Sequence, residues 1–122
     1  MDWRRHRDAP ASGSPLCRLA SLKDGDYKEL QFGAGETPLS LLLHRQGTNV
    51  SAYVNQCPHF SLPLNARPDT FLLMGGRRIM CAWHCAVFEL DTGRCIAGPA
   101  QGSYLERVPV QVQDGAILLG PN

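Results

Sequence analysis

Short runs of alternating hydrophobic and polar residues follow one another along most of the chain. Residues 16–20 and 27–32 alternate in this way and flank a turn-forming segment at 23–26. Residues 39–44 and 49–54 are two further strand candidates, joined by a short glycine-containing segment that favours a hairpin. This half of the chain is therefore predicted to form β-strands separated by tight turns.

The second half repeats the pattern with three more pairs of short runs. Their turns carry Gly-Gly, Asp-Thr-Gly and Asp-Gly, and the pairs are 70–74 with 77–80, 86–90 with 94–97, and 105–112 with 116–119. No segment of ten or more residues combines helical periodicity with helix caps. Turns recurring about every ten residues predict an all-β barrel or sandwich.

The first fifteen residues differ from the rest because they are rich in Arg, Pro, Ser and Gly. A basic run from Arg4 to Arg7 resembles the start of a twin-arginine export signal, but the apolar stretch that such a signal requires does not follow it. We therefore expect residues 1–15 to be a flexible, solvated tail and residues 16–122 to form one domain.

Composition removes several classes of function. The 122 residues carry a net charge of +1 with scattered basic residues, whereas a nucleic-acid-binding protein needs a concentrated basic face. The longest aliphatic cluster, residues 39–43, is far too short to span a membrane. We therefore expect a soluble, cytoplasmic protein without nucleic-acid or membrane partners.

The chain contains five cysteines. In a reducing compartment they are not expected to form a disulfide framework, and clustered Cys and His more often indicate metal binding or catalysis. Cys17 is expected to be a small buried hydrophobic residue. Cys85 and Cys95 flank a predicted hairpin, where a pair of reduced core thiols is favoured over a disulfide.

Two motifs concentrate the remaining cysteines and two of the four histidines. The first is Cys57-Pro58-His59, and the second is Cys81-Ala82-Trp83-His84, with 21 residues between His59 and Cys81. Each motif follows a predicted strand, so each lies on a loop at a strand end. Two such loops that meet would present two thiolates and two imidazoles to one metal centre.

Three interpretations of this set compete. Single buried cysteines and hydrogen-bonded histidines are common in protein cores, but two spaced pairs on loops are not. A structural zinc site also accepts two Cys and two His, although such sites usually open with a Cys-x₂₋₄-Cys segment that is missing here. The pattern favours a [2Fe–2S] cluster with thiolates on one iron and imidazoles on the other, an arrangement that raises the potential above an all-cysteine cluster.

The stretch from residue 53 to 119 resembles the Rieske ferredoxin family, whose Cys-x-His and Cys-x-x-His pattern falls on the two motifs. Phe88-Glu89-Leu90 before a turn and Gly98-Pro99 downstream also match. The resemblance implies stacked antiparallel sheets with a small cluster-binding subdomain, built from loops at about 55–64, 80–89 and 96–102. It assigns Cys57, His59, Cys81 and His84 as the ligands of one Rieske [2Fe–2S] cluster per chain.

Departures from the family concern the loops rather than the ligands. Family members usually carry Pro and Gly around the second histidine, where this chain has Ala82 and Cys85, and Ser61 stands where glycine is common. Because glycine permits a positive φ, Cys85 implies an altered turn or local backbone strain.

Four neighbouring residues indicate a low reduction potential. High-potential Rieske proteins carry a disulfide at the positions of Leu62 and Trp83, and Ser and Tyr hydroxyls at those of Ala86 and Phe88. Hydrogen bonds to the sulfurs stabilise the reduced cluster, so their loss lowers the potential. The resemblance is therefore to the oxygenase-associated, low-potential branch.

The resemblance implies a non-catalytic electron carrier, a monomer or weak oligomer, that passes electrons from a flavin reductase to a terminal oxygenase. A small Rieske-like subunit of an assimilatory nitrite reductase is the alternative. The chain is not expected to be an oxygenase itself, because only His6 and His44 remain for a second iron site and 122 residues leave no room for a catalytic domain.

Overall fold

A computed structural model divides the chain into two compact units, Met1–Val54 with Arg107–Asn122, and Asn55–Glu106. We call them the terminal unit and the central unit. All strand pairs in the described residues are antiparallel, and the helical elements there are two short 3₁₀ turns, so the all-β prediction is confirmed. The structure describes residues 3–33, 35, 38–58, 63–65, 71–74, 77–82, 85–98 and 101–120, with only the backbone at 72–74.

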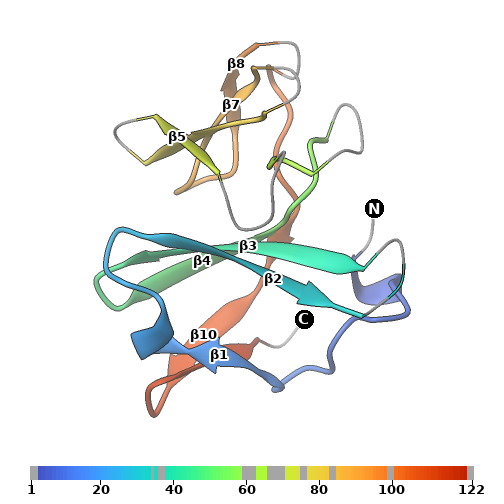
Figure 1. Cartoon of the computed structure of the whole chain (residues 1–122), viewed down its shortest axis with the longest axis vertical. Coiled ribbons are helices and arrows are strands. Elements are labelled where there is room, and N and C mark those ends of the chain that lie inside the picture. The colour runs from blue at the N-terminus through green and yellow to red at the C-terminus, as the bar shows by residue number, and fades with distance from the viewer. Residues whose placement is uncertain are drawn as a thin grey trace. The chain divides into compact units, whose positions relative to one another are not determined.

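The larger sheet of the terminal unit has the strand order β2-β3-β4-β9 (Figure 1). Its strands are β2 (Tyr27–Phe32), β3 (Leu39–Gln46), β4 (Asn49–Val54) and β9 (Arg107–Val108). The predicted hairpin is present, because β3 pairs with β4 in a register that ends at Gln46 opposite Asn49. Consecutive residues Leu41, Leu42 and Leu43 are all buried, so β3 is covered on both faces.

A second sheet of the terminal unit joins the two ends of the chain. Its order is β1-β11-β10, formed by β1 (Pro15–Arg18), β11 (Ala116–Leu119) and β10 (Val110–Gln113). The expected strand at 16–20 ends early, because a 3₁₀ turn, η2, occupies Leu19–Ser21.

Pro109 explains why the single strand predicted at 105–112 is two strands. β9 before it pairs with β4, whereas β10 after it pairs with β11 in the other sheet. Proline has no backbone N–H to continue a ladder, so the chain changes sheets at this residue. The Pro109 carbonyl still accepts a hydrogen bond from the Gly120 N–H at 2.8 Å.

Apolar side chains from both sheets form the core of the terminal unit. Its buried members are Trp3, Leu22, Leu39, Leu41, Leu43, Ala52, Val54, Val108, Ile117 and Leu119. Cys17 packs against this cluster while partly buried. The expectation that Cys17 behaves as a small hydrophobic residue agrees with this packing.

The N-terminal residues differ from the expected solvated tail. Trp3 begins a 3₁₀ turn, η1 (Trp3–Arg5), and is only 2% exposed. Further along, the Gly13 N–H donates to the Leu119 carbonyl at 2.8 Å, and Ser12 Oγ donates to the Gly120 carbonyl at 3.1 Å. Burial of one large indole outweighs the polar composition that indicated a tail.

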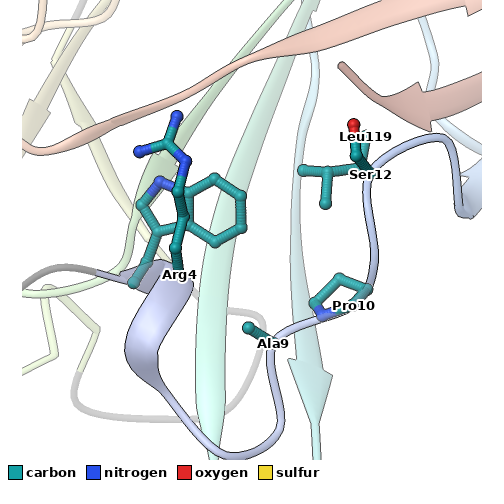
Figure 2. A pocket seen from close by; sticks show the side chains of 6 residues that line it. Arg4, Ala9, Pro10, Ser12 and Leu119 are labelled. Carbon is teal, nitrogen blue, oxygen red and sulfur yellow. The ribbon is translucent and has the colours of Figure 1, made fainter. Parts of the chain in front are cut away.

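A pocket of about 190 Å³ lies beside this N-terminal segment (Figure 2). It is lined by Trp3, Arg4, Ala9, Pro10, Ser12 and Leu119. The Arg4 guanidinium stacks over the Trp3 ring, with Cζ 4.7 Å from the ring centroid. None of the lining residues is one of the predicted cluster ligands.

Substitution Trp3→Phe tests whether the N-terminal segment belongs to the core. We expect it to lower the free energy of unfolding by about 1 kcal/mol, because a buried ring shrinks and its stacking with Arg4 weakens. The Trp3 indole N–H has no hydrogen-bond partner in the structure, so no such bond is lost. Urea unfolding measures the change. An unchanged free energy of unfolding would support the interpretation of residues 1–15 as a solvated tail.

The central unit contains one four-stranded sheet in sequence order, β5-β6-β7-β8 (Figure 1). Its strands are β5 (Leu72–Met74), β6 (Arg78–Met80), β7 (Val87–Glu89) and β8 (Cys95–Ala97). The predicted pairings of 70–74 with 77–80 and of 86–90 with 94–97 are both present. Within the described part of the chain, no helix has the length and hydropathy needed to cross a membrane.

Candidate metal centre

The first candidate loop leaves β4 after Val54 and carries Cys57. The Cys57 side chain is fully buried, as is Leu64 near the end of the loop. His59, the second predicted ligand here, lies outside the described residues. The structure therefore places one of the two predicted ligands of this loop, in an environment closed to water.

Two asparagines close the first loop. Asn55 Nδ2 donates to Asn65 Oδ1 at 2.7 Å, and the Leu64 N–H donates to Asn55 Oδ1 at 2.9 Å. Both amides are buried, at 4% and 7% exposure. Sequence analysis did not single out these residues, although a polar residue two positions before a candidate ligand was a usable signal.

The second candidate loop is a tight turn between β6 and β7. The Cys81 N–H donates to the Ala86 carbonyl at 2.7 Å, and the Cys85 N–H donates to the Cys81 carbonyl at 3.1 Å. Cys81 is fully buried, whereas His84 lies outside the described residues. The turn requires Cys85 at φ 61°, which confirms the strain expected where the family has glycine.

A backbone hydrogen bond joins the two loops. The Ala82 N–H, directly after Cys81, donates to the Leu64 carbonyl at 2.8 Å. Leu64 also donates its N–H to the Asn55 side chain. Hydrogen bonds through Asn55, Leu64 and Ala82 therefore connect the segment before Cys57 with the turn that begins at Cys81. The fold thus brings the two cysteine loops side by side, as the motif spacing predicted.

A third loop lies against the second. Gly98 follows β8 with φ 91°, and a Cβ added there would lie 2.8 Å from Ala86 Cα and 3.0 Å from the Cys85 carbonyl oxygen. The Gln101 N–H donates to the Gly98 carbonyl at 3.2 Å, and the Cys95 N–H donates to the Ser103 carbonyl at 2.8 Å. The described part of the segment expected at 96–102 is therefore folded onto the Cys81 turn; Pro99 and Ala100 lie outside it.

None of the five cysteines, all of which lie in the described part of the chain, forms a disulfide there. Cys95 is buried and its Sγ donates to the Ala97 carbonyl at 3.2 Å, whereas Cys85 is exposed. The expectation of two reduced core thiols is therefore correct for Cys95 and wrong for Cys85. The reason is the Cys85 backbone, whose left-handed conformation ends the turn at the surface.

The donor set fits an iron–sulfur cluster. Cys57 and Cys81 are buried, neither forms a disulfide within the described residues, and they lie on two loops joined by a hydrogen bond. Ferric iron is held by thiolates, so two such cysteines suit one iron of a cluster. Without His59 and His84, the described residues contain no group of three or more Cys, His, Asp or Glu that could hold a metal.

The strain at Cys85 gives a test that needs no metal. We expect Cys85→Gly to raise the free energy of unfolding of the cluster-free protein by about 1 kcal/mol, since glycine adopts positive φ without a steric cost. The Cys85→Ala variant keeps the Cβ and the strain, so it should show no gain. Denaturant unfolding of both variants separates the backbone effect from the loss of the thiol, and equal stabilities would contradict the strain.

Comparison with protein families shows that residues 12–113 match the Rieske [2Fe–2S] domain. Among curated proteins, apoptosis-inducing factor 3 of Homo sapiens and of Mus musculus is 28% identical over 78 residues. That stretch is 64% of this chain and 11% of the relatives. The chain thus matches about a tenth of the length of these curated relatives.

Solved structures share the fold at low sequence identity. The ferredoxin of carbazole 1,9a-dioxygenase from Nocardioides aromaticivorans IC177 has a TM-score of 0.68 at 24% identity, covering 92% of this chain and 100% of that one. A Sphingomonas yanoikuyae B1 ferredoxin has a TM-score of 0.66 at 24% sequence identity. The match covers 91% of this chain and 100% of that ferredoxin. The terminal oxygenase of the same Nocardioides enzyme has 0.71 at 22%, but only 30% of that chain is covered.

Proposed function

The chain belongs to the Rieske [2Fe–2S] domain family, and from this premise we propose that it is a one-electron carrier. The cofactor of that family is a [2Fe–2S] cluster, which takes up and releases one electron at a time. The observation that carries the proposal is the pair of buried cysteines on two loops joined by a hydrogen bond.

The ligand set is Cys57 and Cys81 on one iron, with His59 and His84 on the other. The buried thiols support the first assignment, since a water-free environment protects a thiolate–iron bond. The histidines follow from their places in the two motifs, two residues after Cys57 and three after Cys81. A mixed thiolate and imidazole set is what distinguishes this cluster from an all-cysteine one.

The potential of the cluster belongs at the low end of the family's range. Ala86 and Phe88, which stand where high-potential members carry Ser and Tyr, are fully buried beside the Cys81 turn. Neither side chain has a hydroxyl to donate to a cluster sulfur, so the reduced state gains no such stabilisation.

The partners that fit this carrier are a flavin reductase as donor and a terminal oxygenase as acceptor. Support comes from the fold, which covers the whole length of two ferredoxins, one of them the ferredoxin of a dioxygenase. The carrier itself performs no catalysis and works as a monomer or weak oligomer. Its contacts with partners are small and transient, which suits fast exchange of electrons.

Anaerobic purification followed by metal analysis and spectroscopy tests the proposal. We expect a red-brown protein with two irons and two acid-labile sulfides per chain, and an EPR spectrum with the low average g value of mixed-ligand clusters. A colourless protein with one zinc per chain would contradict it and support a structural zinc site. Reduction by a flavin reductase and reoxidation by an oxygenase then test the partners.

Substitution His84→Cys tests the histidine assignment. If His84 binds the cluster, a thiolate in its place adds negative charge and shifts the reduction potential downward, toward the values of all-cysteine clusters. Protein-film voltammetry measures the potential. The exposed-strand variant Asn49→Ala serves as control, and an unchanged potential in His84→Cys removes this residue from the ligand set.

A further inference from the structure

Within the described part of the central unit, the Asn55 side-chain amide forms hydrogen bonds through both its oxygen and its nitrogen. Its Oδ1 accepts from the Leu64 N–H at 2.9 Å, and its Nδ2 donates to Asn65 Oδ1 at 2.7 Å. With Asn55 4% exposed and Asn65 7% exposed, water does not compete for these bonds. A buried amide that loses its partners costs more than an exposed one, so the pair strongly favours this loop conformation.

The same bonds reach the second cysteine. The Leu64 peptide receives its hydrogen bond from Ala82, and Ala82 follows Cys81 directly. On the other side, Asn55 stands two residues before Cys57. A continuous path, Asn65 to Asn55 to Leu64 to Ala82, therefore connects the backbone beside one thiol to the backbone beside the other.

We propose that Asn55 is a positioning residue that holds the two cysteine loops at the spacing the cluster requires. It touches neither the cluster nor a partner in this proposal, and it acts by fixing Leu64, which carries the bond to Ala82. The inference rests on the proposed function, because it needs Cys57 and Cys81 as ligands. It adds a residue outside the two motifs to the cluster site.

Two variants of Asn55 remove one or both of its side-chain hydrogen bonds. Asn55→Asp keeps the shape and the acceptor for the Leu64 N–H, but it removes the donor to Asn65 Oδ1 and places a buried carboxylate beside Asn65. Asn55→Ala removes both bonds. Asn65→Ala leaves the Leu64 bond in place, and Asn49→Ala, at the exposed start of β4, is the control.

The main measurement is the rate at which an iron chelator removes the cluster from purified holoprotein, read from the visible absorbance. We expect the rate to rise about tenfold in Asn55→Asp and further in Asn55→Ala, because one or two buried hydrogen bonds no longer hold the loops. Asn65→Ala should show a smaller increase and Asn49→Ala none. The EPR g values and reduction potential should move in the Asn55 variants as well.

The outcomes separate this inference from the proposed function. If purified wild-type protein contains no iron and no acid-labile sulfide, the proposed function is wrong, and so is the positioning role of Asn55. A wild-type protein with the cluster, whose Asn55 variants keep the wild-type cluster lifetime, g values and potential, overturns the positioning role alone. The positioning role is also overturned if the cluster-free Asn55 variants unfold at a lower temperature while the cluster signals stay unchanged. In that case Asn55 contributes to stability alone.

Discussion

Substitution Cys81→Ala is expected to abolish the iron–sulfur cluster, leaving iron and acid-labile sulfide close to zero per chain. Cys81 is fully buried, it begins the turn closed by the Ala86 carbonyl, and its neighbour Ala82 is bonded to the first loop. Alanine offers no thiolate, and Cys85, the other described cysteine of this turn, has an exposed side chain whereas that of Cys81 is buried. Metal analysis and visible absorbance measure the loss.

Cys95→Ala is the matched control for this experiment. Cys95 is as buried as Cys81, and neither forms a disulfide within the described residues, so the packing lost on substitution is similar. Its Sγ donates to the Ala97 carbonyl, and we expect the substitution to cost about 1 kcal/mol of stability while the cluster stays. A cluster retained in Cys81→Ala, or lost equally in both variants, would remove Cys81 from the ligand set.

Substitution Gly98→Ala is expected to lower the free energy of unfolding by about 3 kcal/mol, the sum of a left-handed backbone penalty and forced overpacking. The added Cβ would stand 2.8 Å from Ala86 Cα, which is backbone and has little room to move. Because Ala86 closes the Cys81 turn, the displacement should also speed cluster loss. Denaturant unfolding of the cluster-free protein isolates the first effect.

Gly102→Ala is the control because Gly102 has nearly the same φ as Gly98 but has free space around the position of an added Cβ. Gly102 has φ 93°, close to the 91° of Gly98, but nothing lies within 4 Å of an added Cβ. We expect it to cost only the backbone term, about 1 kcal/mol. Equal losses in the two variants would show that the contact between the third loop and the Cys81 turn carries no stability.

Local sequence was enough to predict the strands of this protein and their hairpins. The β3–β4, β5–β6 and β7–β8 pairs lie where alternation and turn residues placed them. Short-range pairing depends on turn chemistry and on the side-chain period, both of which can be read from neighbouring residues. The strand predicted at 105–112 was wrong in one respect, because Pro109 moves its second half into another sheet.

Burial that depends on distant residues was not predicted. Trp3 belongs to the core because residues from both sheets enclose it, which composition over the first fifteen residues does not reveal. Cys85 and Cys95 flank the same predicted hairpin, yet Cys85 is exposed and Cys95 is buried. Such differences arise from packing between segments far apart in sequence.

The cluster motifs are the part of the site that the sequence determined by itself. Cys-x-His and Cys-x-x-His carry their chemistry in residue type and spacing, and the family match over residues 12–113 agrees with a Rieske [2Fe–2S] cluster, while the four ligands stay a prediction. Four ligands on two loops were thereby predicted, with the two histidines still outside the described residues.

Only the tertiary structure decided how the two cysteine loops are held together. Asn55, Leu64 and Ala82 join them through a buried amide and a backbone carbonyl, and Gly98 closes the third loop over the Cys81 turn. Ligand identity follows from side-chain chemistry, which is local. Ligand position depends on hydrogen bonds between residues nine or more positions apart, and these form only when the chain has folded.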